Sequence, residues 1–444
     1  DTSDLKNGVA ILENAAKSID ALRQGYLTEE AKIFIQENSI DTYEGAVYNL
    51  ALLFDMTGDK NYLKEAFRYF EKSKSTVLSE SIQSSRMYIP LNIDSTLVMK
   101  EKSVNRDIRD LEISLSQEQN DSIQRVLKQS LFVKRREADS IGLVIKRDWP
   151  EYYELKYQSD VVSASEVMAG LPTESAMLTY LKGDSSWYVM TLTATDISLF
   201  ETDKISDESL QGFTELIRDP GSNNADYIAL GHELYKTLVA LPLAGSSPET
   251  LLIIPDGQLY YVPFDALSTS GETENPEYLV SSLAIRYLNS ATLQAAGGTN
   301  DSYKYSYMGF APSYVLMGSV ENSDVIRDDL VPLGGNLEEV NFAGNIFRGE
   351  VFVNDEATKR TFQQDQISTR ILHLAMHATA DDDNPMHSGL WFSSSDSSQN
   401  AYLNAEEIYG LNIQSELVVL SACNTGVGKV RRGEGVMSLS RAFM

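Results

Sequence analysis

The stretch Ile371-Leu372-His373-Leu374-Ala375-Met376-His377 is an apolar run that ends in a histidine, and a second run, Glu416-Leu417-Val418-Val419-Leu420-Ser421-Ala422-Cys423, ends in the only cysteine of the chain. Apolar runs of this length are typical of central strands in a parallel sheet. In open α/β sheets, reactive groups collect at the carboxyl ends of such strands. The sequence therefore predicts that His377 and Cys423 lie at the same edge of a sheet.

The order and chemistry of these two residues are those of a cysteine peptidase. In caspases a histidine precedes the catalytic cysteine by roughly 50 residues, and His377 stands 46 residues before Cys423. A thiolate attacks the peptide carbonyl, and a histidine can pass the proton in either direction. We therefore predict Cys423 as the nucleophile and His377 as the general acid and base. The alternative is an inert cysteine, because free cysteine is among the most often buried residue types.

Short motifs surround the two residues. They lie at residues 373–379, 384–385, 388–390, 403–408, 418–426 and 433–436, with weaker ones upstream at 253–257, 331–333, 338–340 and 356–358. Together they resemble the CHAT domain, a family of caspase-like and separase-like cysteine peptidases. The resemblance covers about 270 residues, a span in line with ordinary domain sizes.

We expect an α + α/β fold in three parts, and the resemblance implies the second and third of them. Residues 1–150 are expected to be helical, 151–302 to form a caspase-like half without its own dyad, and 303–444 to form the catalytic half, with a mainly parallel sheet. Members of the family usually continue with a further strand and helix beyond the point where this chain stops. We therefore expect the catalytic half to be truncated at its C-terminus and its substrate pocket to be affected.

The same resemblance implies the remaining parts of the site. The oxyanion would bind the backbone N–H groups of Ala378 and Cys423. Many relatives carry glycine at the first of these places, and alanine retains the N–H. Candidate residues of the substrate pocket are Asp381, Asp382, Asp383, His387 and Asn424. His387 lies in a polar loop, where a position at the surface or the pocket rim is expected rather than a catalytic role.

Other polar residues have structural interpretations. His373 lies four residues before His377, a spacing that in a helix would suggest a metal pair. In a strand the two share a face, so we predict a hydrogen-bonded structural histidine. Asp256 and Asp265 have no histidine or cysteine beside them, which favours turn and capping roles. No ligand set has the spacing of a metal site, so we predict no metal and no cofactor.

Residues 1–150 carry apolar side chains at three- and four-residue intervals, which predicts antiparallel helices. Residues 46–54, a break at 57–59 and residues 66–73 resemble a tetratricopeptide repeat, and long helices are expected beyond residue 74. About three stacked repeats are needed for a stable core, so we expect more repeats before Asp1. The concave surface of such repeats suits a regulatory or substrate protein.

Charge is distributed unevenly along the chain. Residues 1–150 carry a net charge of −3 and residues 151–444 a net charge of −24. Direct binding of nucleic acid requires a basic footprint, so this class of ligand is not expected. An acidic catalytic part would favour a basic or otherwise non-acidic residue before the scissile bond. An apolar pocket is the alternative, because net charge also serves solubility alone.

Composition limits the class of protein further. A single cysteine excludes a disulfide scaffold and suits a reducing cytoplasm. No apolar run approaches the ~18 residues that a membrane span needs, and no signal-peptide pattern opens the chain. We predict a cytoplasmic protein that does not act at a membrane, and the sequence leaves the oligomeric state open.

The leading hypothesis is a cysteine endopeptidase, a hydrolase that cleaves a protein substrate after recruitment or activation through the helical repeats. Resemblance to proteins that combine tetratricopeptide repeats with a CHAT domain implies a role in bacterial antiviral defence or regulated cell death, where some relatives cleave gasdermin-like pore formers. The alternative is a catalytically silent scaffold, in which the caspase-like fold only mediates protein–protein interaction.

Overall fold

The computed structural model describes residues 1–24, 29–74, 76–79, 94–117, 120–150, 161–184, 186–203, 205–219, 221, 223–296, 302–314, 330–364, 367–381, 387–393, 401–409, 411, 413–422 and 428–443. The chain divides into two compact units. The first comprises Asp1–Gly297 and Val430–Gly435, and the second comprises Gly298–Lys429 and Val436–Met444. Each unit has its own hydrophobic core and is described by itself.

The first unit begins with four helices. They are α1 (Thr2–Gln24), α2 (Glu29–Glu37), α3 (Ile40–Thr57) and α4 (Asn61–Lys72). Helix α3 ends where the sequence predicts a break: Gly58 adopts a left-handed φ of 69°, and its N–H donates to the Phe54 carbonyl. Glycine tolerates this conformation without a steric penalty, which makes it a common helix terminator. The three-residue connection brings α3 and α4 together as neighbours.

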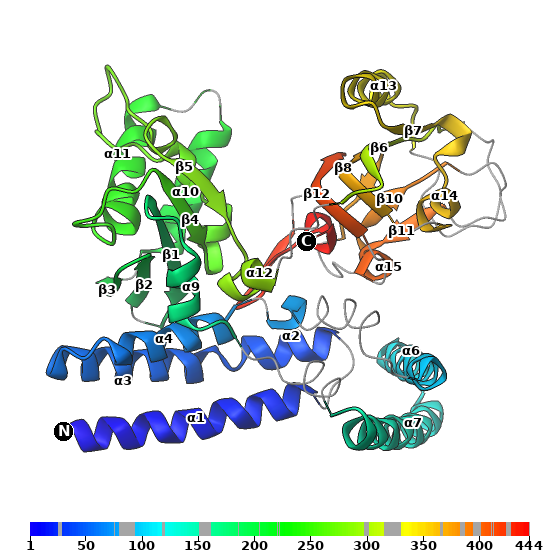
Figure 1. The fold of residues 1–444 in the computed structure, drawn as a ribbon, viewed down its shortest axis with the longest axis horizontal. Helices are drawn as coiled ribbons and strands as arrows, with labels where there is room; N and C mark the ends of the chain where they lie inside the picture. The colour runs from blue at the N-terminus through cyan, green and yellow to red at the C-terminus, as the bar shows by residue number, and fades with distance from the viewer. Residues whose placement is uncertain are drawn as a thin grey trace. The chain divides into compact units, whose positions relative to one another are not determined.

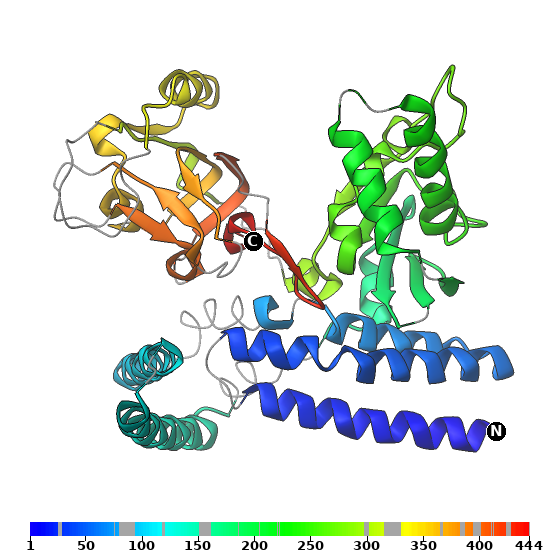
Figure 2. The same ribbon diagram turned by 180° about the vertical axis from the view of Figure 1, so that it is seen from behind.

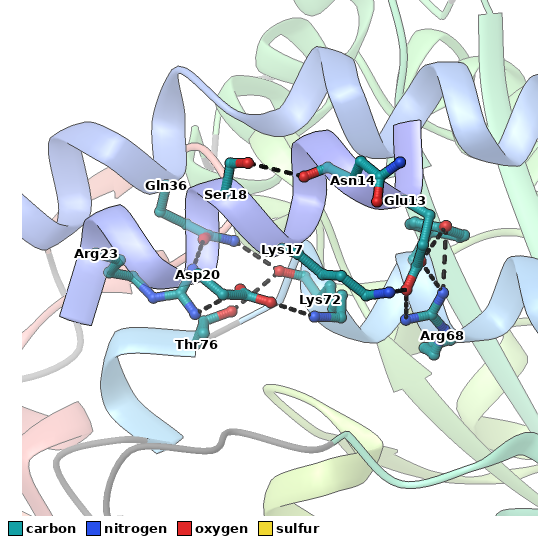
Figure 3. A network of polar contacts seen from close by, with 11 residues as sticks. Glu13, Asn14, Lys17, Ser18, Asp20, Arg23, Gln36, Arg68, Lys72 and Thr76 are labelled. Carbon is teal, nitrogen blue, oxygen red and sulfur yellow. Dashed lines mark hydrogen bonds and ion pairs between the residues drawn. The ribbon is translucent and has the colours of Figure 1, made fainter. Parts of the chain in front are cut away.

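Polar contacts tie α1 to α4 (Figure 3). The Glu13 carboxylate accepts hydrogen bonds from the Arg68 guanidinium and, at 2.7 Å, from the Tyr69 hydroxyl. Two helical turns later, Asp20 forms an ion pair with the largely buried Lys72. Because these groups are partly removed from water, their mutual contacts fix how α1 lies along α4.

Two long helices follow in the same unit, α6 (Ser95–Gln117) and α7 (Asp121–Asp148). They lie side by side in both views (Figure 1 and Figure 2). Lys134 pairs with Asp107 and Lys100 pairs with Glu137, so residues late in one helix meet residues early in the other. This is the antiparallel helix pair that the sequence predicts beyond residue 74.

The first unit also contains a five-stranded sheet in the order β3-β2-β1-β4-β5. Its strands are β1 (Ser175–Lys182), β2 (Ser186–Thr193), β3 (Ile197–Asp203), β4 (Thr250–Ile254) and β5 (Ala284–Tyr287). Strand β4 pairs in parallel with β1 and β5, whereas β2 pairs antiparallel with β1 and β3. Strands β2 and β4 coincide with the apolar stretches at residues 187–192 and 251–254.

Both faces of this sheet are buried. Along β1, Met177 and Leu181 enter one core, and Ala176, Leu178 and Tyr180 enter the other. The first core also contains residues of α1, α3, α4 and α9 (Ala164–Gly170), and α4 lies beside α9 and β3 (Figure 1). The second core is closed by α10 (Asp207–Arg218) and α11 (Asn224–Tyr235). The N-terminal helices and the sheet therefore share one hydrophobic core.

Short elements complete the first unit. They are η1 (Lys236–Ala240), η2 (Gly257–Tyr261), η3 (Phe264–Ala266), η4 (Leu279–Ser281) and α12 (Ala291–Ala296). Asp256 caps η2 by accepting the Gly257 N–H, which confirms its predicted capping role. The same oxygen lies 3.1 Å from the ammonium of Lys74, and both side chains are almost fully buried.

The second unit is built on a four-stranded parallel sheet in the order β12-β8-β6-β7. The strands are β6 (Tyr305–Ala311), β7 (Glu350–Val353), β8 (Ile367–Ala375) and β12 (Ile413–Ser421). Strands β8 and β12 are the two apolar runs that the sequence predicts, although each ends before the reactive residue. The predicted parallel pairing of these runs is confirmed.

Helices cover both faces of this sheet. Helix α13 (Asn336–Phe347) packs on the face that carries Gly309, where a Cβ atom would lie 2.5 Å from the Val340 side chain. The opposite face, with Phe310 and Leu374, packs against α14 (Lys359–Gln364) and α15 (Ala405–Tyr409). A small antiparallel sheet, β11-β10-β9, joins the same core through Leu390 and Leu403.

The remaining elements of the C-terminal region are short. They are β9 (Ala378–Thr379), β10 (Gly389–Trp391), β11 (Tyr402–Asn404), β13 (Lys429–Arg431), β14 (Gly435–Met437), η5 (Asn354–Glu356) and η7 (Leu439–Phe443). Strands β13 and β14 form a two-stranded sheet, and the residues between them belong to the first unit.

The combination of helices with parallel α/β sheets agrees with the predicted fold class. The repeat character of the first helices, the caspase-like arrangement of the halves and the domain limits stay predictions. Within the described parts of the chain, no helix is both long and apolar enough to cross a membrane.

Candidate active site

The carboxyl ends of β8 and β12 lie next to each other. The two strands pair in parallel with Ser421 opposite Ala375. His377 follows Ala375 by two positions, and Cys423 follows Ser421 by the same number. Cys423 lies outside the described residues, and Asn424 does as well. Neighbouring strands are separated by about 4.8 Å, so the register brings both chain segments to one edge of the sheet.

His377 is held at three points. Its backbone N–H donates to the Tyr314 hydroxyl oxygen over 2.9 Å, and its carbonyl accepts the Trp391 N–H at 2.9 Å. Its ring Nε2 lies 2.7 Å from the Val331 carbonyl oxygen. A carbonyl can only accept, so this contact requires hydrogen on Nε2. In the neutral imidazole, Nδ1 is then the free acceptor.

Tyr314 supports the histidine from beneath. Its ring centroid lies 4.6 Å from that of His377, and its hydroxyl donates to the Trp391 carbonyl over 2.6 Å. Burial raises the pKa of Tyr314, and the hydrogen bond from the His377 N–H opposes this only in part. Tyr314 therefore stays a neutral phenol that accepts one backbone hydrogen bond and donates another.

Ala378 opens strand β9 directly after the histidine. It is paired with Leu390 of β10, and the flanking bond runs from the Trp391 N–H to the His377 carbonyl. In an antiparallel ladder this pattern marks a non-hydrogen-bonded pair, so the Ala378 N–H points away from β10. Because β9 is the outer strand of its sheet, this N–H faces the free edge.

His373 lies within strand β8, four residues before His377. Only 5% of its surface is exposed. Its Nδ1 is 2.9 Å from the Tyr307 hydroxyl, and its Nε2 is 3.0 Å from the Glu339 carboxylate on α13. Since the carboxylate accepts, Nε2 carries hydrogen. The prediction of a buried, hydrogen-bonded structural histidine is confirmed.

The candidate pocket residues are only partly described. Asp382 and Asp383 lie outside the described residues. The Asp381 N–H donates to the Ser388 hydroxyl over 2.9 Å, and its carboxylate lies 3.9 Å from the His387 ring. His387 is exposed, and its carbonyl accepts the Tyr402 hydroxyl. These contacts bring Asp381, near the start of the β9–β10 connection, close to His387, near its end.

One group of carboxylates comes within metal-ligand spacing in the described chain, namely Asp41, Glu44 and Asp184. Two of the three are already engaged by other groups. Asp41 forms an ion pair with Arg432, and Glu44 accepts the Asp184 backbone N–H. Carboxylates with these partners do not by themselves form a metal site.

Three residues that support His377 were not assigned roles from the sequence. They are Tyr314, Val331 and Asn336. The Asn336 amide donates to the Ala375 carbonyl over 3.3 Å and so ties α13 to the end of β8. Tyr314 follows strand β6, and the rule that functional groups collect at the carboxyl ends of parallel strands applies to it as well. A backbone carbonyl such as that of Val331 leaves no signal in a sequence.

Comparison with known families agrees with this geometry. The family model of the CHAT domain matches residues 229–444. This match begins inside α11, so strands β1 to β3 and all earlier helices precede it. No curated protein matches the chain.

The fold combines helices with parallel α/β sheets, and the matched residues include the whole four-stranded parallel sheet of the second unit. Residues 229–444 of the chain are thus similar to the CHAT domain.

Proposed function

We propose that the protein is a cysteine endopeptidase in which Cys423 is the nucleophile and His377 the general acid and base. The observation that carries the proposal is the parallel register of Ser421 with Ala375, because both reactive residues follow that pair by two positions. A His–Cys pair at one sheet edge is the arrangement that nucleophilic cysteine chemistry requires.

The contacts of His377 suit its proposed role. With Nε2 hydrogen bonded to the Val331 carbonyl, Nδ1 is the nitrogen that accepts the thiol proton. The thiolate then forms a bond to the peptide carbonyl carbon, and the carbon–nitrogen bond breaks as Nδ1 returns the proton to the leaving amine. Water, deprotonated by the same nitrogen, hydrolyses the thioester and releases the cysteine.

The position of the Ala378 N–H supports the proposed oxyanion site. A donor that is not used in the β9–β10 ladder is available to a ligand at the free edge. Aimed at the developing negative charge, such a donor stabilises the transition state more than the ground state. The N–H of Cys423 is proposed as the second donor.

We further propose that the N-terminal helices receive a regulatory or substrate protein. Support comes from the shared core, since α3 and α4 pack on the same sheet as β4, which lies within the matched family region. Because the packing is close, a displacement of these helices would also displace residues of the sheet beside them. A protein substrate in antiviral defence, such as a gasdermin-like pore former, is the context that the family resemblance suggests.

Peptide-library cleavage by the protein tests the proposal. Cys423→Ala and His377→Ala should each abolish cleavage while the melting temperature stays nearly unchanged. His387→Ala is the matched control, because this exposed histidine is near the site but has no proposed proton-transfer role, and it should retain activity.

Retained cleavage by Cys423→Ala would contradict the nucleophile assignment. A wild-type chain that cleaves no peptide, with or without candidate partners, but still binds a partner protein would favour the scaffold alternative. Since the chain has one cysteine, mass spectrometry of an acyl-enzyme or of a covalent inhibitor adduct reports on Cys423 alone.

A further inference from the structure

Helix α13 begins with Asn336, whose side chain lies at the carboxyl ends of the two central strands of the second unit. Its Nδ2 is 3.0 Å from the carbonyl oxygen of Pro312, which follows β6, and 3.3 Å from that of Ala375, the last residue of β8. Carbonyl oxygens only accept hydrogen bonds, so the NH2 group must face them, and its two hydrogens serve the two acceptors. Asn336 therefore bridges the ends of β6 and β8.

Each bridged carbonyl lies two residues before a side chain of the candidate site. Tyr314 follows Pro312 by two positions, and His377 follows Ala375 by two positions. The rings of Tyr314 and His377 have centroids 4.6 Å apart, and the Tyr314 hydroxyl accepts the His377 backbone N–H. The distance between the two strand ends sets how these groups meet, so the Asn336 bridge affects their contact.

The segment that leads into α13 carries the carbonyl that orients the His377 ring. Val331 stands five residues before Asn336, and its oxygen is 2.7 Å from Nε2 of His377. The Val331 side chain is 58% exposed, whereas the neighbouring Leu330 and Leu333 pack against the core of the unit. Five residues span at most about 18 Å when fully extended, so the position of Asn336 limits where the Val331 carbonyl can lie.

Close packing under the first half of α13 brings Asn336 to the strand ends. Ala311 and Ala375 form a small buried cluster with Val340 of α13, and their short side chains let the helix approach the sheet. Gly335, directly before the helix, has a φ of +148°, a conformation that residues with a Cβ atom rarely adopt. Small strand residues and a glycine at the helix entry thus let the Asn336 amide reach both carbonyls.

We infer that Asn336 is a positioning residue of the proposed dyad, which holds the backbone of His377 and the acceptor of its ring in one arrangement. One amide ties together the end of β6, the end of β8 and the segment from Val331 into α13. The histidine follows the second of these and its ring acceptor belongs to the third, so their relative position depends on the bridge. The inference adds a residue to the proposed peptidase site and in that sense rests on the proposed function.

The hydrogen bond of the His377 ring allows a test that does not need peptidase activity. Asn336→Asp removes both donors at nearly unchanged volume and turns a carboxylate toward two carbonyl oxygens. The Nε2–H of His377 should then leave the Val331 oxygen more often and exchange with water about fivefold or more faster. NMR of the protein with ¹⁵N-labelled histidine measures this exchange, and loss of the signal in His377→Gln assigns it. Asn336→Ala, which adds no charge, should also accelerate the exchange.

Asn341→Asp is the matched control, because the Asn341 amide donates to the Leu337 carbonyl within α13 at 2.8 Å. It introduces the same charge on the same helix without touching a strand end, so it should leave the exchange of the His377 ring within about twofold of the wild-type rate. The ring N–H of His373, which bonds to a carboxylate of α13, reports general loosening of the helix.

Two results of the exchange experiment would overturn the inference. One is an equal acceleration of the His377 and His373 ring signals in Asn336→Asp, which would indicate that the whole helix loosens. The other is an effect of Asn341→Asp on His377 as large as that of Asn336→Asp.

Peptide cleavage is the second readout and separates this inference from the proposed function. If the protein is a peptidase, Asn336→Asp and Asn336→Ala should lower kcat about tenfold or more and change KM less than about twofold, because a displaced histidine slows proton transfer. Asn341→Asp should retain the wild-type kcat, and an equal loss in this variant would count against the inference. If the wild-type protein cleaves no peptide, the proposed function fails, whereas the exchange rates still decide whether Asn336 orients His377.

Discussion

The backbone N–H of His377 donates to the hydroxyl oxygen of Tyr314, 63 positions earlier, over 2.9 Å. The same hydroxyl donates to the Trp391 carbonyl, and the Trp391 N–H donates to the His377 carbonyl. The phenol and the β10 strand thus hold the histidine backbone from both sides. Its ring is oriented separately by the Val331 carbonyl.

Replacing Tyr314 by phenylalanine should therefore lower kcat for peptide cleavage. The ring under His377 is retained, but both hydrogen bonds of the hydroxyl are lost, and the histidine gains freedom to move. A small displacement of a catalytic group reduces the rate by about 10- to 100-fold. We expect this loss in kcat with little change in KM, measured on a fluorogenic peptide.

Tyr307→Phe is the matched control for this experiment. Tyr307 is also buried in the same sheet, but its hydroxyl contacts the structural His373 and the Val340 carbonyl. Both substitutions should lower the free energy of unfolding by about 1–2 kcal/mol, since each removes buried hydrogen bonds. Equal effects of the two substitutions on kcat would contradict a specific role for Tyr314.

Removing one partner of the buried pair of Lys74 and Asp256 should destabilise the fold strongly, because it leaves the other charge buried. Burial lowers the pKa of Lys74, and Asp256 and Glu71 oppose that shift. Asp256→Ala removes the nearest partner of the ammonium and also the acceptor of the Lys182 and Gly257 N–H groups. Urea unfolding should show a loss of about 3–5 kcal/mol, the usual effect of breaking a buried pair on one side.

Asp265→Ala is the comparison for Asp256→Ala. Asp265 accepts one hydrogen bond, from the Tyr287 hydroxyl at 2.6 Å, and it lies at the surface. Its removal should lower the unfolding free energy by only about 1 kcal/mol. If Asp265→Ala lowers the unfolding free energy as much as Asp256→Ala does, the effect of Asp256→Ala does not come mainly from the buried pair.

Acid should weaken the packing of α1 on α4 through Glu13. Burial alone raises the pKa of Glu13, but hydrogen bonds from Arg68 and Tyr69 outweigh it and lower the pKa to about 2 from the ordinary 4.5. A lowered folded-state pKa stabilises the fold fully above pH 4.5 and less as the pH falls toward 2. Glu13→Gln should therefore destabilise the chain at pH 6 and have a smaller effect at pH 3.

Urea unfolding of the wild-type chain and of Glu13→Gln at pH 6, 4.5 and 3 measures how the loss of stability depends on pH. Glu65→Gln is a suitable control, because Glu65 lies on the same helix as Arg68 without a direct hydrogen bond to Tyr69 or Arg68 among those described. An effect of Glu13→Gln that grows as the pH falls would contradict the role of the ionised carboxylate.

Local patterns were sufficient for much of this structure. The β8 and β12 runs are apolar because both faces of the sheet are covered, and Gly58 ends α3 because it adopts a left-handed conformation. The alternation along β8 also identifies His373 as the inward-facing neighbour of His377. In each case, the property that decides the structure is contained within a few residues of sequence.

Contacts between residues far apart in the sequence could not be predicted from local patterns. The hydrogen bond between Glu434 and Val77 joins positions 357 residues apart, and the sequence around neither residue predicts the other as its partner. The amphipathic faces of α3 and α4 predict burial but not that β1, β2 and β4 complete their core. Orientation of His377 by a carbonyl oxygen likewise depends on the path of the backbone and not on the identity of Val331.

The residue preferred before the scissile bond is the last prediction. Residues 151–444 carry a net charge of −24, and Asp381 lies four residues after His377 with an exposed carboxylate. Such a field attracts a cationic side chain and repels an aspartate. Fluorogenic peptides that differ only at this residue should therefore be cleaved faster with arginine or lysine than with aspartate.

Charge substitution distinguishes an electrostatic preference from an apolar pocket. Asp381→Asn, alone and together with Asp382→Asn and Asp383→Asn, should weaken the preference for arginine over leucine. Raising the salt from 0.05 to 0.5 M should also weaken this preference, because the Debye length shortens from about 14 to about 4 Å. Exposed Asp226, on α11 of the first unit, provides the control Asp226→Asn, which should change nothing. A preference for leucine or methionine that is insensitive to salt would establish the apolar pocket, and a preference for aspartate would contradict both.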